Sequence, residues 1–387
     1  MSPWGMFEFI DMCNAMNITA VVTTFAEITP SDYANMVEYC WGKADTKYGA
    51  LRISDGHPAP YNATWFELGN EQLNPDFAAQ AAAMEARAAE IGLPERTLHY
   101  LYPSNCGGKE PCSHFPSNET AAAVDKLNIG SNAVFAMHCQ KQDDPDCLQF
   151  AYDMLAKQEF ASWSTLILET NLATHDVGRM LVEARAENML LSDTKGKVHG
   201  RAASFCLERS GYNEGGLNDQ GLIFFLPNAT WLQPPGLVHK MYWDTWQPNG
   251  VAVITNSSAS CPQAGVDFSA QASDDGKTVV LRLLNSNGEQ SVNYTIDVHG
   301  GTSSSGGGGG GVGSSRDGGK ASVGSNRIVV SSITSQTMHN PNLAASNTPS
   351  EPEAVVPGPL QSLGNSLPVA FSAPPNSVAV IVVVMRE

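Results

Sequence analysis

The chain has 387 residues, of which 42% are hydrophobic and 16% are charged. This length and composition exclude a disordered tail protein and a small disulfide-stabilised module, and they allow two domains of roughly 100–200 residues each. The formal net charge of −17 repels phosphate groups, so we expect neither nucleic acid nor an anionic membrane as a partner. An uncharged substrate suits this charge better.

The sequence gives mixed signals about its compartment. It contains no run of about 18 apolar residues, so no transmembrane helix is expected. The first five residues, Met1–Gly5, lack the basic and apolar regions of a signal peptide. N-glycosylation sequons nevertheless occur at six positions: Asn17, Asn62, Asn118, Asn228, Asn256 and Asn293.

Eight cysteines are compatible with an oxidising or a reducing compartment. Cys106 and Cys112 flank one polar loop, and Cys139 and Cys147 flank another. Each pair is equally well interpreted as a short disulfide or as two free thiols. No Cys-x-x-Cys pair occurs, which argues against a structural zinc site.

The first 250 residues alternate short apolar runs with amphipathic stretches. Strands are predicted at 18–25, 64–68, 97–102, 133–138, 165–169 and 202–207. Helices are predicted at 30–41, 76–91, 119–127, 147–157 and 177–191. This alternation indicates an α/β fold with a parallel sheet, either doubly wound or a (β/α)8 barrel. No Gly-rich phosphate loop opens a helix, which disfavours a nucleotide-binding fold.

The pattern changes near residue 250, where helical periodicity ends. Strand-like runs follow at 251–255, 278–284, 291–298, 327–332 and 378–385, and they predict an all-β sandwich domain. A Gly/Ser tract at about 300–320 cannot bury apolar surface, so we expect a disordered insertion there. The predicted domains are residues 1–248 and 249–387.

Two glutamates stand at the carboxyl ends of predicted parallel strands, where barrel enzymes gather their active sites. Glu71 follows the strand at 64–68, and Glu169 ends the strand at 165–169. Glycoside hydrolysis needs two such groups, one to protonate the leaving oxygen and one to attack the anomeric carbon or activate water. For either residue alone, an ion pair at the barrel rim is the structural alternative. Glu67 shares the strand parity of Glu71 and competes with it, but its deeper position favours a supporting role.

The run from Arg52 to Asn62, followed by Trp65–Glu71, resembles the segment of glycoside hydrolase family 51 that leads into its acid/base. That family consists mainly of α-L-arabinofuranosidases, with some endoglucanases. Phe7–Cys13 resembles the family's helix before its third barrel strand. Residues 340–347, 355–358 and 374–384 resemble its carboxyl-terminal sandwich, so the resemblance covers most of the chain outside the Gly/Ser tract.

Counted from this resemblance, the strand at 18–25 is the third of the barrel. We therefore expect a (β/α)8-type barrel that lacks its first two strands, followed by the all-β sandwich. An incomplete gene model or a fragment is the expected explanation, and it would also account for sequons without a signal peptide.

The resemblance implies roles for four residues. Glu71 matches the acid/base, Glu169 the nucleophile, and Asn70 the asparagine that binds the sugar 2-hydroxyl. His138 matches a histidine of the active-site wall, although a core histidine is an equal alternative. The family retains anomeric configuration, which implies carboxyl groups about 5–5.5 Å apart. The sequence departs from the family pattern at two places. Cys139 stands where the family usually has an aromatic residue, and Thr170–Leu172 stands where it usually has an aromatic or small apolar segment.

The expected function is the release of terminal α-L-arabinofuranosyl residues from arabinose-containing cell-wall polysaccharides by a secreted or cell-wall enzyme. No metal or organic cofactor is implied, because two carboxyl groups and water suffice. Two alternatives stay open beside a non-functional fragment. One is an endo-acting β-glucanase on the same scaffold. The other is a catalytically impaired chain that binds carbohydrate through tryptophans such as Trp41, Trp65 or Trp163. The sequence does not indicate the oligomeric state.

Overall fold

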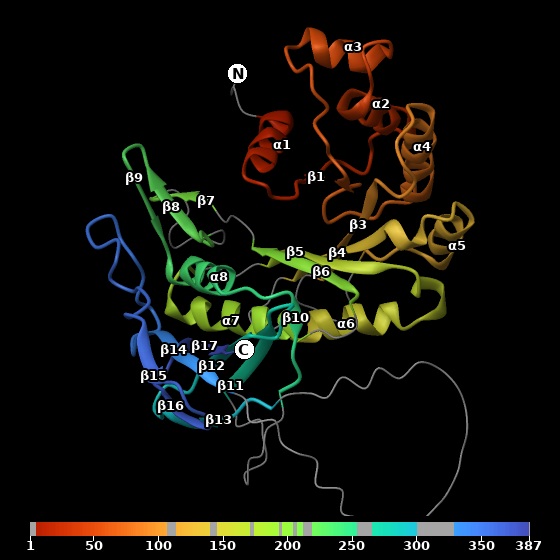
Figure 1. Ribbon diagram of the computed structural model, residues 1–387. Coiled ribbons are helices and arrows are strands. Elements are labelled where there is room, and N and C mark those ends of the chain that lie inside the picture. Colours follow the sequence, from red (N-terminus) through yellow and green to blue (C-terminus); the bar gives the residue numbers. More distant parts are fainter. Residues whose placement is uncertain are drawn as a thin grey trace, which may run out of the picture. The chain divides into compact units, whose positions relative to one another are not determined.

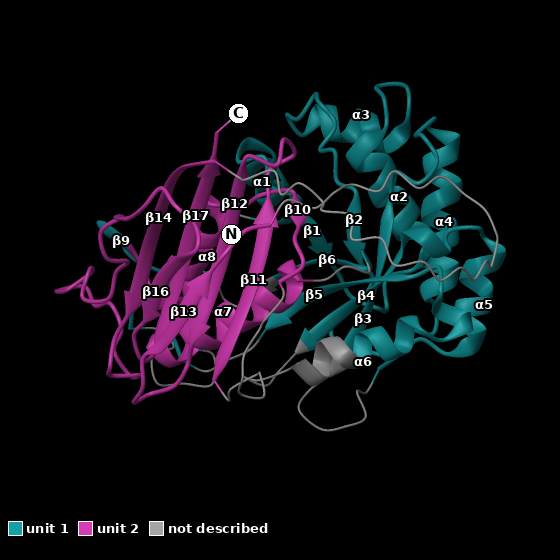
Figure 2. Ribbon diagram, turned by 60° about the horizontal axis from the view of Figure 1, so that its bottom comes forward, with its two compact units in different colours: residues 1–175, 193–230 teal, residues 176–192, 231–387 magenta. Residues whose placement is uncertain are grey.

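The computed structural model describes residues 5–106, 114–139, 145–170, 174–192, 196–203, 207–211, 219–253, 265–299 and 329–386. The chain forms two compact units (Figure 2). The first comprises residues 1–175 and 193–230, and the second comprises residues 176–192 and 231–387. Both candidate cysteine pairs, the sequon at Asn256 and the Gly/Ser tract lie outside the described side chains.

The first unit is built on a parallel sheet of six strands; those other than β2 are labelled in Figure 1, and Figure 2 also labels β2. Its strands are β1 (Val21–Thr23), β2 (Trp65–Glu67), β3 (His99–Cys106), β4 (Ala133–Cys139), β5 (Ser164–Thr170) and β6 (Val198–Ala203). The spatial order β1-β2-β3-β4-β5-β6 repeats the sequence order. A doubly wound sheet reverses its strand order at a switch point, whereas a barrel sheet does not. The order therefore favours the barrel alternative.

Helices connect these strands. They are α1 (Met6–Ala15), α2 (Pro30–Trp41), α3 (Lys47–Ser54), α4 (Phe77–Glu90), α5 (Asn118–Lys126) and α6 (Pro145–Leu155), with short 3-10 helices at Gly130–Asn132 and Gln158–Phe160. The start of α2 is fixed by Thr29, whose side chain accepts a hydrogen bond from the Asp32 amide. Pro30 follows at the first helical position, where its missing N–H costs nothing. Both predicted ends of α2 are confirmed, whereas α3 was not predicted.

An aromatic cluster forms part of the core between the sheet and its helices. Trp163 is fully buried and packs against Phe77, Phe135 and Phe160, with ring centroids 5.0–5.9 Å apart. Trp41 donates a hydrogen bond from its indole N–H to the Ala63 carbonyl. These contacts make both tryptophans structural, and a buried Trp163 has no face to offer a sugar.

The strand predicted at 202–207 divides into two. Its first part belongs to β6, and Leu207 begins β7 (Leu207–Arg209). With β8 (Ile223–Leu226) and β9 (Ala229–Leu232), β7 forms a separate sheet of order β7-β8-β9.

The second unit holds two antiparallel sheets. The larger has the order β10-β11-β12-β17-β14-β15, and the smaller pairs β13 with β16. The strands are β10 (Asn249–Gly250), β11 (Val266–Ala272), β12 (Thr278–Asn285), β13 (Val292–Ile296), β14 (Val330–His339), β15 (Gln361–Gly364), β16 (Val369–Ala373) and β17 (Ser377–Met385). One apolar cluster joins the two sheets, including Leu283 and Ile381 of the larger and Ile296 and Val369 of the smaller. This arrangement is a sandwich.

Two helices cover the other face of the larger sheet: α7 (Val177–Leu191) and α8 (Pro234–Asp244). A second apolar cluster joins Met180 of α7 and Val238 of α8 to Val280 and Val380 of the sheet. The second unit therefore differs from the predicted segment 249–387, because it includes both helices. In the described part of the chain, no helix combines the length and apolar character needed to cross a membrane.

Candidate active site

The carboxyl end of β2 turns sharply before Glu71. Gly69 has φ +133°, and a Cβ there would lie only 2.7 Å from Cγ of Pro103. Only glycine fits this turn. Glu71 itself has φ +51°, in the left-handed region that a glutamate seldom adopts. The turn places the Glu71 carboxylate against the imidazole of His138, where Oε1 lies 3.2 Å from Nδ1.

Glu169 reaches the same imidazole from the neighbouring strand. His138 of β4 is in register with Glu169 of β5, but Met137 is in register with Ile167, so the ladder shifts by one residue between them. Such an irregularity re-aims the side chains beside it. Oε2 of Glu169 lies 2.8 Å from Nδ1 of His138.

A third carboxylate, from Glu67 on β2, faces the opposite edge of the His138 ring. Its Oε1 lies 3.3 Å from Nε2 of His138, and both side chains are almost wholly buried. The Glu67 Oε2 atom accepts a hydrogen bond of 2.8 Å from the hydroxyl of Thr23 on β1. The strands β1, β2, β4 and β5, or their carboxyl ends, therefore contribute to one polar group.

These carboxylates determine the charge of the imidazole. Burial alone lowers the pKa of His138, but the hydrogen bonds and charges of Glu169 and Glu67 outweigh it and raise this pKa to about 10. The ring is thus cationic at neutral pH. Its own side chain is 3% exposed, whereas Glu71 and Glu169 are 29% and 28% exposed. The two carboxylates can meet a ligand, while the cation between them stays covered.

The separation of the two exposed carboxylates bears on their chemistry. One carboxylate oxygen of Glu71 and one of Glu169 lie within 4.8 Å of each other. Direct attack by a carboxylate on a sugar requires carboxyl groups about 5–5.5 Å apart, whereas a water-mediated reaction requires about 6.5–9.5 Å. The arrangement suits the first geometry.

Of the predicted site residues, the structure brings Glu71, His138 and Glu169 into contact. Asn70 lies beside Glu71 in the turn and is exposed. Thr23 was not singled out from the sequence. The feature that could have identified Thr23 is its position at the carboxyl end of β1, in register with Glu67.

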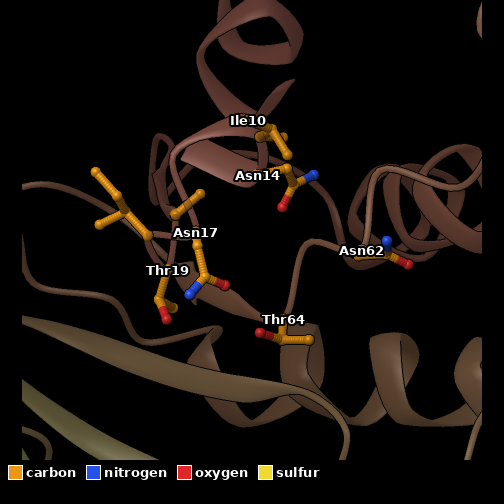
Figure 3. Close-up of a pocket in the computed structure, with 8 residues that line it drawn as sticks. Ile10, Asn14, Asn17, Thr19, Asn62 and Thr64 are labelled. Carbon is orange, nitrogen blue, oxygen red and sulfur yellow. The ribbon is translucent and has the colours of Figure 1, made fainter. Parts of the chain in front are cut away.

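A separate cavity of about 230 Å³, whose lining is drawn in Figure 3, lies at the amino ends of β1 and β2 and is not lined by these carboxylates. Its lining consists of Ile10, Asn14, Asn17, Ile18, Thr19, Ala20, Asn62 and Thr64. The lining contains no charged group, so this cavity does not supply acid/base chemistry.

Residues 2–95 match the family model of the alpha-L-arabinofuranosidase 1 domain. This segment, about a quarter of the chain, is similar to that domain. The predicted resemblance to the family 51 arabinofuranosidases is confirmed, and the matched segment includes the turn that carries Glu71.

Two curated arabinofuranosidases are similar to this chain over short segments. A probable alpha-L-arabinofuranosidase A from Aspergillus terreus is 34% identical over 84 residues, covering 17% of this chain and 13% of the relative. An extracellular exo-alpha-L-arabinofuranosidase from Streptomyces chartreusis is 37% identical over 65 residues, covering 16% of this chain and 8% of the relative. The match thus spans less than a fifth of either arabinofuranosidase.

The likeness in structure extends over nearly the whole chain. The solved GH51 alpha-L-arabinofuranosidase from Thermotoga petrophila aligns with a TM-score of 0.66 and 16% identity, covering 98% of this chain and 78% of that one. At 16% sequence identity, this structural similarity shows that the two chains share a fold. The parallel sheet therefore has the architecture of the (β/α)8-barrel arabinofuranosidases, with an additional antiparallel β domain.

Proposed function

We propose that this chain is a retaining glycoside hydrolase that releases terminal α-L-arabinofuranosyl residues from arabinose-containing cell-wall polysaccharides. The observation that carries the proposal is the convergence of Glu71 and Glu169 on one ring nitrogen of His138. Two partly exposed carboxylates at this spacing are the groups that a double displacement at an anomeric carbon requires.

In the proposed first step, Glu169 attacks the anomeric carbon while Glu71 protonates the departing glycosidic oxygen. A bond forms between the sugar and Glu169 as the bond to the leaving group breaks. In the second step, Glu71 takes a proton from water, the water oxygen attacks the anomeric carbon, and the bond to Glu169 breaks. Configuration is retained because inversion occurs twice.

The assignment of the two roles rests on the resemblance and is supported by the contacts of His138. The nucleophile must be ionised, and a cationic imidazole favours the ionised form of the carboxylate nearest to it. Glu169 lies 2.8 Å from Nδ1, whereas Glu71 lies 3.2 Å away. The shorter contact suits the carboxylate that attacks the anomeric carbon.

Two further residues complete the proposed site. Asn70 is exposed beside Glu71, where its amide suits a hydrogen bond to the sugar 2-hydroxyl. His138 has too little exposed surface for much sugar contact. We therefore propose that it acts through the two carboxylates, by holding them in place and keeping Glu169 ionised.

Secretion is part of the same proposal. Each sequon asparagine in the described ranges is exposed: Asn17, Asn62, Asn118, Asn228 and Asn293. Exposed acceptors suit a glycosylated, extracellular protein. The Streptomyces relative is named as an extracellular enzyme, which supports the same location.

The decisive experiment measures hydrolysis of an aryl α-L-arabinofuranoside and of soluble β-glucan by the full chain. We expect the first to be hydrolysed and the second to resist, and NMR to show the α anomer as the first product. Glu71→Gln and Glu169→Gln should each abolish turnover. Glu95→Gln, at an exposed position before β3, is the matched control and should retain activity.

The other outcomes separate the alternatives. Cleavage of β-glucan alone would favour the endo-acting β-glucanase. Binding of arabinoxylan without hydrolysis by the unaltered chain would favour the carbohydrate-binding protein. The absence of both activities in a folded chain would overturn the proposal.

A further inference from the structure

We propose that Glu71, His138 and Glu169 also form a binding site for a zinc ion, and that the bound ion inhibits the enzyme. The binding of zinc is argued from the contacts of these side chains alone. Only the inhibition rests on the proposed function. The ion is an inhibitor in this proposal, since the reaction proposed above uses no metal.

The three donor atoms are already assembled. One carboxylate oxygen of Glu71, one of Glu169 and one ring nitrogen of His138 all lie within 4.8 Å of one another. Nδ1 of His138 lies 3.2 Å from Oε1 of Glu71 and 2.8 Å from Oε2 of Glu169. Zinc binds imidazole nitrogen at about 2.0–2.1 Å and carboxylate oxygen at about 2.0–2.2 Å. Ligand atoms around one such ion lie about 3.4 Å apart in a tetrahedron. The site therefore needs side-chain adjustments of an ångström or less at the His138 contacts.

The surroundings of His138 supply the second argument. A histidine that binds metal usually donates its other ring N–H to a carboxylate, which fixes the tautomer and the ring orientation. Nε2 of His138 faces Oε1 of Glu67 at 3.3 Å. Neither atom has another hydrogen-bond partner among the described residues. Nε2 keeps its proton toward Glu67, while zinc displaces the proton of Nδ1 that faces the two exposed carboxylates, because metal binding to imidazole releases a proton.

The donor set selects the kind of metal. Mg²⁺ and Ca²⁺ prefer six or more oxygen ligands, whereas one imidazole and two carboxylates with an open position suit zinc. Two carboxylates also neutralise the charge of a divalent ion. The remaining position is directed to solvent, because Glu71 and Glu169 are the exposed members of the group.

A bound zinc ion and a reacting sugar exclude each other. Coordination takes the lone pair with which Glu169 attacks the anomeric carbon, and it keeps Glu71 from carrying the proton for the leaving group. Zinc should therefore act as an inhibitor that competes with substrate.

The test is calorimetric titration of the chelator-treated full chain with zinc chloride. We expect one site that Mg²⁺ does not fill. Glu71→Gln, His138→Gln and Glu169→Gln should each weaken it at least tenfold. Glu67→Gln leaves all three ligands in place and should weaken it by about 10–100-fold, the usual effect of losing such a supporting carboxylate. His299→Gln removes an exposed histidine beside Asp297 and is the control that should bind normally.

Thermal unfolding without metal checks that each variant is folded. If His138→Gln does not fold, the zinc affinity of the near-isosteric variant Glu169→Gln decides the test. Retention of zinc affinity in folded Glu71→Gln and Glu169→Gln would overturn the proposal, as would the absence of binding by the unaltered chain. The two proposals fail separately. Zinc binding without arabinofuranoside hydrolysis would overturn the function and leave the site, whereas hydrolysis that zinc does not inhibit would overturn the inhibition.

Discussion

Glu67 and His138 face each other across the strand ends of the first unit, with Oε1 of one 3.3 Å from Nε2 of the other. Glu67 is held in turn by the hydroxyl of Thr23. Because His138 contacts both exposed carboxylates through its other nitrogen, Glu67 sets the position and charge of the ring on which they converge. Its role is thus to position the candidate catalytic groups without touching the substrate.

Replacing Glu67 with glutamine tests this role. The amide keeps the size of the side chain but removes the charge that helps to raise the pKa of His138. We expect the pKa of His138 to fall and kcat to drop about tenfold, the cost of roughly one charge-assisted hydrogen bond. KM should change little, because Glu67 does not reach the sugar.

The pKa of His138 is followed by NMR titration and the activity by pH-rate profiles. Glu85→Gln is the matched control, since it removes a carboxylate that accepts a hydrogen bond from the buried Tyr100 hydroxyl. An unchanged histidine titration in Glu67→Gln would contradict the prediction, whatever happens to activity.

The raised pKa of His138 also predicts a dependence of stability on pH. A folded pKa of about 10 lies above the ordinary 6.5, so the folded state holds the proton more tightly than the unfolded state. The stabilising contribution is complete below about pH 6.5 and is lost as the pH rises through about 10. Between these values the free energy of unfolding should fall by about 1.4 kcal/mol for each pH unit.

Urea unfolding of chelator-treated protein from pH 6 to 10 measures this slope. Other groups titrate in the same range, so the comparison with His138→Gln isolates the contribution of the imidazole. Equal slopes for the two proteins would show that the ring is not held as a cation.

The sequence predicted helices best where local signals are strong. Both ends of α2 and α7 agree with their predicted bounds, because each helix follows a side chain that caps its first turn, Thr29 or Asp176. The helix α8 was missed because it begins with Pro234 and Pro235, which resemble a loop although proline suits the first turn. The strands β11, β15 and β16 were also missed, and residues 251–253 form no strand.

Only part of the candidate site could be predicted from the sequence, because local signals show some of its residues but not their contacts. The position of Glu71 and Glu169 after apolar strands is visible in the sequence. The contact of both with His138 depends on the turn at Gly69 and on the register shift after Met137, which are properties of the assembled sheet. The link from Thr23 to Glu67 likewise depends on the pairing of β1 with β2.

Two histidines near the amino ends of β3 and β6, His99 and His199, predict a loss of stability in acid. His99 stacks on Trp65 with ring centroids 4.1 Å apart, and His199 lies edge-on to the same indole. Burial lowers the pKa of both histidines, and the charge of His199 further lowers that of His99. A folded pKa below 6.5 means that their contribution is present above about pH 6.5 and is lost as the pH falls through the folded values.

Thermal unfolding between pH 7 and 4.5 detects this loss, with Trp65 among the fluorescent probes. His99→Phe keeps an aromatic ring against Trp65 but cannot be protonated, so its melting temperature should fall less steeply in acid. His299→Gln, which removes an exposed histidine, should follow the unaltered protein. A His99→Phe curve parallel to that of the unaltered protein would contradict the assignment.

Gln80 connects the loop after β1 to the segment that follows Glu71, and its loss should cost stability. This fully buried side chain on α4 donates hydrogen bonds of 2.8 Å to the carbonyls of Ala26 and Ile28, and it accepts one from Asn74. Gln80→Leu keeps a similar volume but leaves these groups unpaired, at about 1–3 kcal/mol each. We expect the free energy of unfolding, measured in urea, to fall by at least about 3 kcal/mol, the lower end of the sum over the three groups. Gln158→Leu, at an exposed site, is the control, and an equal loss there would show that the effect is not specific to the Gln80 contacts.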